Sequence, residues 1–202
     1  MSGDAGLRLV AIGASAGGVD AVGELLAGLP AGFDIPVVVV LHVPPGRSSQ
    51  LAEVFSLRST LRVREAADKM PLAPGTVLVA PPDYHLLVER DETVSLSSEE
   101  AVMFSRPSID LLFESIAWSL GAAALGIVLT GANEDGARGL ALLRAAGGTA
   151  WVQAPDDAQV STMPQAALER AGADATLPLA RMKDALSRLR RGSPAAAALS
   201  PG

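Results

Sequence analysis

The chain has no cysteine among its 202 residues, which excludes disulfide bonds, zinc–thiolate sites and a cysteine nucleophile together. It has only two histidines, so we expect no structural metal and no metal at the site. Aromatic residues make up only 3% of the chain, whereas hydrophobic residues make up 49%. The core must therefore be aliphatic, which favours buried parallel strands covered by helices rich in alanine and leucine.

The chain also lacks a surplus of basic residues, as its formal net charge of −6 shows. Nucleic-acid binding needs a net basic face, so we expect no nucleic-acid partner. The hydrophobic runs are too short to span a bilayer, and we expect no membrane insertion. Residues 1–6 are polar and lack a basic stretch followed by an apolar one, which argues against a secretory signal. We therefore expect a cytoplasmic protein.

Short apolar runs alternate with stretches of helical spacing along the chain, as expected for a single α/β domain. Strands are predicted at 7–12, 36–41, 125–129 and 149–152. Helices are predicted at 19–29, 48–57 with a cap at Ser48 or Ser49, 107–120, 137–146, 164–171 and 179–191. The predicted domain spans residues 7–191. Residues 1–6 are expected to be disordered, as is the small, proline-rich tail at 192–202.

The middle of the chain differs from the rest, because it holds four short β runs at 61–65, 76–80, 86–89 and 93–96. Turn signals such as Ala73-Pro-Gly75 separate them. This pattern predicts an antiparallel meander inserted between the two halves of the α/β core.

Gly13-Ala-Ser15-Ala-Gly17 follows the first strand and precedes the first helix, and it fits the G-x-S-x-G pattern of a nucleophile elbow. The helix N-terminus would offer the N–H groups of Ala16 and Gly17 to a developing oxyanion. Two alternatives are a glycine-rich turn that only packs the helix and one that holds a phosphate. A dinucleotide site predicts an acidic residue about twenty residues beyond the glycines, at the end of the second strand. His42 ends that strand instead, which disfavours the nucleotide alternative.

His42 closes a run of four valines, so it is predicted at the carboxyl end of a parallel strand, on the same edge as Ser15. Its position favours it as the general base. His85, between a turn and a β run of the insertion, is the alternative base.

Asp135 lies in the loop that leaves the strand at 125–129, where a carboxylate could orient the imidazole of His42. Aspartate before glycine is also common in turns and at helix N-caps. Glu134 is the competing carboxylate. The combination of Ser15, His42 and Asp135 predicts a serine hydrolase with a catalytic triad.

Five blocks resemble the catalytic domain of the chemotaxis receptor methylesterases, the CheB-type protein-glutamate methylesterases. They are Ala11-Ile-Gly-Ala-Ser-Ala-Gly-Gly18, His42-Val-Pro-Pro-Gly46, Arg106-Pro-Ser-Ile-Asp-Leu-Leu-Phe113, Leu129-Thr-Gly-Ala-Asn-Glu-Asp-Gly136 and Met163-Pro164. The resemblance extends from about Leu9 to about Leu189. It implies a doubly wound, mostly parallel sheet with helices on both faces and a small antiparallel β insertion.

The resemblance also implies a reaction: hydrolysis of glutamyl methyl esters on chemoreceptor signalling helices, together with deamidation of certain glutamines. It places the nucleophile on Ser15, the base on His42 and the aspartate on Asp135. The methylated chemoreceptor is then the protein substrate, and two-component signalling partners are expected in a phosphorelay. Family members of the response-regulator type carry a receiver domain ahead of the catalytic domain, whereas this sequence begins at the catalytic domain.

A second departure concerns the loop before Asp135, where the best-known members carry Met-Gly and this chain has Ala132-Asn133. The change alters the pocket, although a backbone donor at Ala132 survives. We expect oxyanion or pocket contacts from Ala16, Gly17, Arg106 and the loop residues Thr130, Gly131, Ala132 and Asn133. Ser108 either lines the cleft or caps a helix. No cofactor is expected.

Three alternatives stay open. The same chemistry could act on small esters, in a general carboxylesterase of the same fold. The glycine-rich turn could bind a nucleotide or phosphate. The chain could also be a catalytically silent signalling module.

Overall fold

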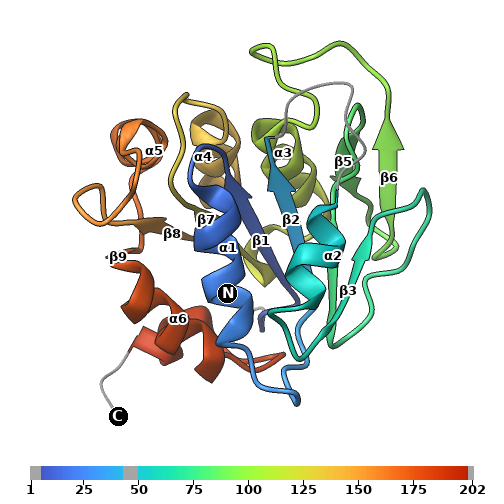
Figure 1. Ribbon diagram of the computed structural model, residues 1–202, viewed down its shortest axis with the longest axis horizontal. Helices are drawn as coiled ribbons and strands as arrows, with labels where there is room; N and C mark the ends of the chain where they lie inside the picture. Colours follow the sequence, from blue (N-terminus) through green and yellow to red (C-terminus); the bar gives the residue numbers. More distant parts are fainter. Residues whose placement is uncertain (1–5, 43–49, 200–202) are drawn as a thin grey trace.

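The computed structural model describes residues 6–42 and 50–199 (Figure 1). The expectations for residues 1–5 and 200–202, and for a helix cap at Ser48 or Ser49, lie outside the described residues.

A seven-stranded parallel sheet forms the centre of the molecule, in the order β3-β4-β2-β1-β7-β8-β9. Its strands are β1 (Leu9–Ala14), β2 (Val37–Leu41), β3 (Arg62–Glu65), β4 (Thr76–Val79), β7 (Ala124–Val128), β8 (Thr149–Gln153) and β9 (Ala175–Leu177). Every residue of β1, β2 and β7 is buried. Strands covered on both faces need continuous aliphatic runs, which explains the four valines of β2.

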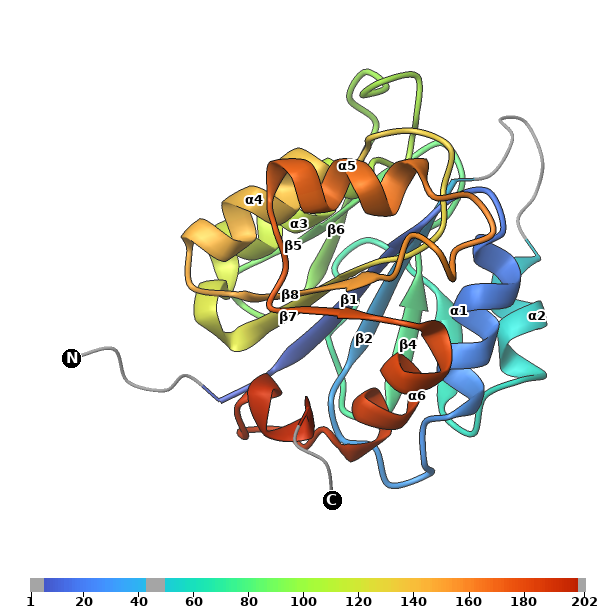
Figure 2. The ribbon, with the colours of Figure 1, turned by 90° about the vertical axis from the view of Figure 1, so that its left-hand side faces the viewer.

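Helices cover both faces of this sheet (Figure 2). The face that includes Val10 and Ile12 packs against α1 (Gly18–Ala27), α2 (Leu51–Ser56) and α6 (Leu179–Arg188). The face that includes Leu9 and Ala11 packs against α3 (Ile109–Ser119), α4 (Ala137–Ala145) and α5 (Thr162–Arg170). Alternate residues of one strand thus enter two separate cores, and the predicted doubly wound fold is confirmed.

The predicted four-strand meander is wrong in part. Only β5 (His85–Val88) and β6 (Val94–Ser97) form an antiparallel pair. β3 and β4 belong to the main sheet, parallel to each other, and β4 is also parallel to β2. The buried Val77 and Val79 of β4 extend the same apolar face as β2, which draws this strand into the central sheet.

The prediction of a disordered tail is wrong for residues 192–199. The N–H of Gly192 donates to the carbonyl of Leu7 at 2.8 Å, and the N–H of Leu7 donates to the carbonyl of Ser193 at 3.1 Å. A 3₁₀ helix, η2 (Ala195–Leu199), then buries Ala195 and Ala198 against the core that contains Val10 and Ile12. Backbone hydrogen bonds and small apolar side chains hold this segment, so it needs no amphipathic period.

Besides η2, two short elements were not predicted, namely strand β9 and the 3₁₀ turn η1 (Gly121–Ala123) that leads into β7. The chain leaves β1 toward α1 on one face and leaves β7 toward α4 on the other. Such a switch between neighbouring strands opens a crevice at their carboxyl ends. Ser15, His42 and the loop before Asp135 all lie at this edge.

Gly13 shows how closely α3 approaches this edge. A Cβ on Gly13 would lie 2.3 Å from Cγ2 of Ile109, the first residue of α3. Gly136, with φ of 97°, would place a Cβ 2.7 Å from the same atom. Ile109 therefore rests on two glycine backbones that lie on either side of the site.

We predict that Gly13→Ala lowers the free energy of unfolding by about 1–3 kcal/mol, because the added methyl group overlaps Ile109 in a packed core. Urea denaturation measures this difference. Gly32→Ala is the matched control, since no atom lies within 4 Å of a Cβ there, and it should change the value by less than about 0.5 kcal/mol. Equal stability of the two variants would contradict the close approach of α3.

Candidate active site

Ser15 directly follows β1, and the backbone pairing of the sheet continues up to it. Ala14 is in register with Leu41 of β2, and the N–H of His42 donates to the carbonyl of Ala14 at 3.2 Å. On the other side, the N–H of Ser15 donates to the carbonyl of Thr130 at 3.0 Å. Since neighbouring strands are about 4.8 Å apart, Ser15 lies between the backbones that carry His42 and the loop after β7.

The turn after Ser15 has the shape that a nucleophile elbow needs. Gly17 has φ of 78° and forms the N-cap of α1, and the N–H of Gly18 donates to the carbonyl of Ser15 at 2.8 Å. Within residues 6–42 and 50–199, the N–H groups of Ala16 and Gly17 donate to no protein acceptor. Two donors at the positive end of α1 are thus available beside Ser15.

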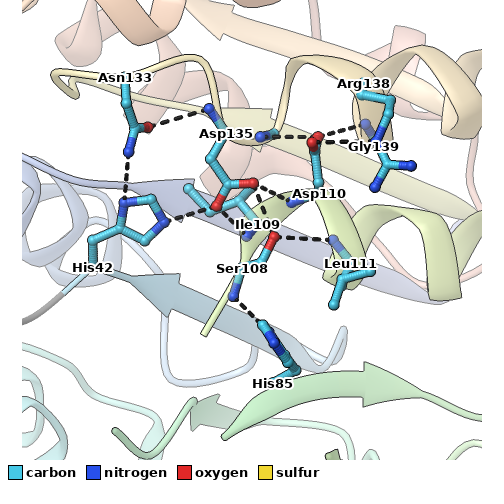
Figure 3. Close-up of polar contacts among 11 residues, drawn as sticks. His42, His85, Ser108, Ile109, Asp110, Leu111, Asn133, Asp135, Arg138 and Gly139 are labelled. Atoms are coloured by element: carbon cyan, nitrogen blue, oxygen red, sulfur yellow. Dashed lines mark hydrogen bonds and ion pairs between the residues drawn. The ribbon is translucent and has the colours of Figure 1, made fainter. Parts of the chain in front are cut away.

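His42 and Asp135 form a close pair, with 2.8 Å between Nε2 of the ring and Oδ2 of the carboxylate (Figure 3). Only 11% of the His42 side chain is exposed, and the Asp135 side chain is fully buried. Oδ2 also accepts the N–H of Ile109 at 2.7 Å. Oδ1 accepts the N–H of Asp110 and the hydroxyl of Ser108, both at 2.9 Å. The carboxylate therefore has four donors and lies at the N-terminus of α3.

These contacts determine the charge of Asp135. Burial alone raises the pKa of a carboxyl group, but the hydrogen bonds from His42, Asp110 and Ile109 favour the ionised form and together hold the pKa of Asp135 below its ordinary value of 3.8. Asp135 is consequently a carboxylate at neutral pH.

Asn133 decides which ring nitrogen of His42 carries the proton. The N–H of Asp135 donates to Oδ1 of Asn133 at 3.2 Å, which turns the amide nitrogen Nδ2 toward Nδ1 of His42 at 3.4 Å. An amide donor faces a lone pair, so Nδ1 is unprotonated and Nε2–H donates to Asp135. The free lone pair of the His42 ring therefore lies on Nδ1. Within the described chain, no hydrogen bond joins the Ser15 hydroxyl to His42, and the Asn133 amide is the group that faces Nδ1.

The carboxylate of Asp110 makes a matching contact in the opposite direction, from α3 to the start of α4. Asp110, in the first turn of α3, accepts the N–H groups of Gly136 and Gly139 at 3.0 and 2.7 Å, at the start of α4. Asp135 caps α3 and Asp110 caps α4. Sequence reasoning missed Asp110, because an acidic residue in a first helical turn ordinarily serves its own helix.

The two alternative side chains have other surroundings. His85 is fully buried, where its Nδ1 accepts the N–H of Ser108 at 3.1 Å and its Nε2 donates to the carbonyl of Glu100 at 3.0 Å. His85 thus joins the start of α3 to the loop before it through two backbone groups, and it is not among the residues that line the cleft at His42. The Glu134 side chain is exposed, while Asp135 contacts His42. Ser108 accepts the N–H of Leu111 at 3.4 Å, which is the N-cap role, one of the two that the sequence left open for it.

Two of the expected oxyanion donors are wrong. The N–H of Thr130 donates to Oε1 of Gln153 at 2.9 Å, and the N–H of Gly131 donates to the carbonyl of Val160 at 3.0 Å. These bonds hold the loop after β7 in place. By contrast, the N–H groups of Ala132 and Asn133 find no acceptor in the described part of the chain.

A cleft of about 420 Å³ opens onto His42, and Arg106 lines it as expected. Its other lining residues are Asp83, Glu100, Ala101, Phe104, Ser105 and Pro107. Nη1 of Arg106 donates to the carbonyls of Ser98 and Glu99, at 3.0 Å each. The guanidinium group therefore holds the loop that forms one wall of the cleft.

The family model described as CheB methylesterase matches residues 10–186. The chain belongs to the CheB methylesterase family. The family match covers most of both cores and every candidate site residue, from Ser15 to Asp135.

Relatives support the same assignment. The chain is 41% identical over 180 residues to a protein-glutamate methylesterase/protein-glutamine glutaminase of Leptospira interrogans, covering 89% of this chain and 93% of that protein. It is 41% identical over 191 residues to such a protein of Pseudomonas aeruginosa, covering 92% of this chain but only 54% of the relative. The crystal structure of the Thermotoga maritima CheB methylesterase catalytic domain matches with a TM-score of 0.85 and 31% identity, over 90% of this chain and 97% of that one.

Within residues 6–42 and 50–199 of this CheB-type chain, no cluster of three or more histidine, aspartate or glutamate side chains has the arrangement of a metal site. Nor does that part of the chain contain a helix with the length and hydrophobicity to cross a membrane.

We predict that Asp135→Asn lowers the free energy of unfolding by about 2–4 kcal/mol at neutral pH, because either amide orientation points an NH₂ group at N–H donors of α3. The pKa of Asp135 is lowered by folding, so its carboxylate stabilises the fold above pH 3.8, and this stabilisation is lost as the pH falls through the folded pKa. The gap between wild type and variant should therefore narrow below about pH 4.

Urea denaturation at neutral pH and at about pH 3 measures this gap. Glu134→Gln is the matched control, and it should change the free energy of unfolding by less than about 0.5 kcal/mol at both pH values, since the Glu134 side chain is exposed. A gap for Asp135→Asn that stays constant with pH would refute the charged cap.

Proposed function

We propose that the chain hydrolyses γ-methyl esters of glutamyl side chains in proteins, with Ser15 as nucleophile, His42 as general base and Asp135 as the group that orients the base. The observation that carries this proposal is the buried His42–Asp135 pair beside Ser15, on neighbouring strand ends. The names of the relatives supply the substrate class and add deamidation of protein glutamines. The methylated signalling helices of a chemoreceptor are the proposed substrate, in the cytoplasm and within a two-component pathway.

In the first half of the reaction, the Ser15 hydroxyl replaces the Asn133 amide at Nδ1 of His42. Nδ1 takes the hydroxyl proton as Oγ attacks the ester carbonyl carbon. Asp135 stabilises the imidazolium through the bond to Nε2–H. The carbonyl oxygen becomes an oxyanion, which the N–H groups of Ala16 and Gly17 at the start of α1 can stabilise, and each donor of this kind contributes about 3–4 kcal/mol.

In the second half, the proton on Nδ1 passes to the methoxy oxygen, and methanol leaves an acyl group on Ser15. Water then loses a proton to Nδ1 and attacks the acyl carbon. Collapse of this second intermediate returns the proton to Oγ and releases the glutamate carboxylate. With a glutamine side chain, ammonia leaves in place of methanol.

The charges of the cleft suit a neutral substrate. Asp83 and Glu100 line it, and the guanidinium group of Arg106 is bonded to two backbone carbonyls. A methyl ester needs no counter-charge, whereas the carboxylate product is repelled by the two acidic side chains. This difference favours binding of the ester and release of the product.

We predict that Ser15→Ala reduces methanol release from a methylated chemoreceptor fragment by roughly 10⁴-fold or more, because the acyl intermediate cannot form. The free energy of unfolding should stay within about 1 kcal/mol of wild type, since the backbone contacts of Ser15 are unchanged. Ser187→Ala, which removes an exposed hydroxyl of α6, is the control and should keep full activity. Methanol release that persists in Ser15→Ala would remove Ser15 from the nucleophile role.

We predict that Asn133→Asp lowers kcat/KM at neutral pH by roughly tenfold or more, with recovery at higher pH. The new carboxylate still accepts the N–H of Asp135, but its other oxygen faces Nδ1 and favours a proton there, which leaves no lone pair for Ser15. The pH dependence of methanol release measures the shift. Asn133→Ala removes the amide without adding charge and should leave the acid limb in place. An acid limb at the same pH in Asn133→Asp and wild type would contradict the assignment of Nδ1 as the base.

A further inference from the structure

The loop between β6 and α3 projects beyond the carboxyl edge of the sheet and ends in a tight turn, Val102-Met103-Phe104-Ser105 (Figures 1 and 2). Phe104 is fully exposed, with a relative accessibility of 104%, and Met103 is 40% exposed. We call Met103 and Phe104 the apolar tip. Phe104 therefore gains nothing from burial within the described chain, and Met103 is only partly covered by it.

The backbone of the apolar tip is strained. Met103 and Phe104 have φ of 50° and 63°, and Val102 and Ser105 exchange backbone hydrogen bonds of 3.1 and 2.8 Å. Two successive residues with positive φ form a type I′ turn, in which glycine, asparagine and aspartate are preferred. Methionine and phenylalanine raise the free energy of such a turn. Turn formation accounts for neither residue, and burial within the chain does not account for Phe104.

The loop beneath the apolar tip is held in place from both sides. Nη1 of Arg106 donates to the carbonyls of Ser98 and Glu99, and Nε2 of the buried His85 donates to the carbonyl of Glu100. These bonds connect the loop to its own two stems and to the hairpin. A pre-positioned loop loses little conformational entropy when it meets a partner.

The apolar tip also borders the site. Phe104 lines the same cleft as His42, while Met103 lines a second hollow of about 160 Å³, whose other lining residues are Val102, Ala137 and the charged Asp110, Glu134, Arg138 and Arg170. A glutamyl ester that reaches His42 must bring its own polypeptide past the turn. We infer that the apolar tip docks onto apolar side chains of the protein that carries the ester, within a few residues of the modified glutamate. This inference rests on the proposed function.

A protein partner fits the local charge better than a membrane does. Glu99 and Glu100 stand in the same loop, and Asp83 lines the cleft beside it. Acidic side chains are repelled by anionic lipid surfaces, whereas loops that bind such surfaces carry lysine and arginine. The only guanidinium group of this loop, Arg106, is bonded to backbone carbonyls.

The test compares two substrates in three variants. The substrates are a methylated chemoreceptor signalling fragment and the γ-methyl ester of N-acetylglutamate α-methylamide, a neutral small ester that has no polypeptide to reach the apolar tip. Phe104→Ala should lower kcat/KM for the fragment by roughly tenfold or more, mainly through KM, because buried aromatic anchors dominate interfaces. Its loss on the small ester should stay below about threefold, so the ratio of the two losses is the readout.

A second variant separates docking from folding. Met103→Asn with Phe104→Gly supplies the residues that a type I′ turn prefers, so it should retain the free energy of unfolding and still lose roughly tenfold or more on the fragment. Leu57→Ala is the matched control, because Leu57 is 90% exposed, ends α2 and lines neither hollow. It should leave both substrates unaffected.

Equal losses on both substrates, or no loss on the fragment, would overturn the docking role while the proposed function stands. Phe104-dependent binding to vesicles of phosphatidylcholine and phosphatidylglycerol, with no selective loss on the fragment, would also overturn it in favour of a membrane contact. A wild-type protein that releases methanol from neither substrate would instead refute the proposed function, and the docking role with it.

Discussion

The buried carboxylate of Asp135 is the interaction on which both the fold at the sheet edge and the site depend. It accepts two backbone N–H groups and a hydroxyl at the start of α3, and its fourth donor is Nε2–H of His42. An ionised group buried without such donors would be strongly destabilising, so α3 must dock for Asp135 to stay charged. Since Asp110 caps α4 in return, the two helices hold the loop that carries Asp135 from both ends. The carboxylate of Asp135 therefore both holds the N-terminus of α3 at the sheet edge and orients the imidazole of His42.

The main outline of the site could be predicted from the sequence, because parallel strands end at one edge and Ser15, His42 and Asp135 each follow such a strand. The direction of the short strands β3 and β4 could not be predicted in this way. β3 and β4 have the length and turn signals of hairpin strands, yet the apolar face of β4 matches that of β2 and draws it into the parallel sheet. The tail at 192–199 escaped prediction because backbone bonds to Leu7 order it, and these leave no pattern in the side chains.

Finer features of the site needed coordinates because they depend on which polar groups are already paired. Thr130 and Gly131 belong to the right loop, but their N–H groups are bound to Gln153 and Val160. Asn133 stood out in the sequence as a departure from the family, and only its contacts show that its amide faces Nδ1 of His42. Gly13 has a second role besides fitting the elbow pattern, because the absence of a Cβ there lets Ile109, at the start of α3, pack against the backbone. The pattern of residue types thus locates the candidate site, and the hydrogen-bond network shows which of its polar groups are already paired.

The central claim, that Asp135 holds His42 through Nε2–H and leaves Nδ1 as the base nitrogen, is open to direct observation. Long-range ¹H–¹⁵N correlation spectra of the ¹⁵N-labelled protein at neutral pH report the protonation of each ring nitrogen. The account predicts a protonated, pyrrole-type Nε2 and an unprotonated, pyridine-type Nδ1 for His42. A spectrum with the proton on Nδ1 and a bare Nε2 would contradict it.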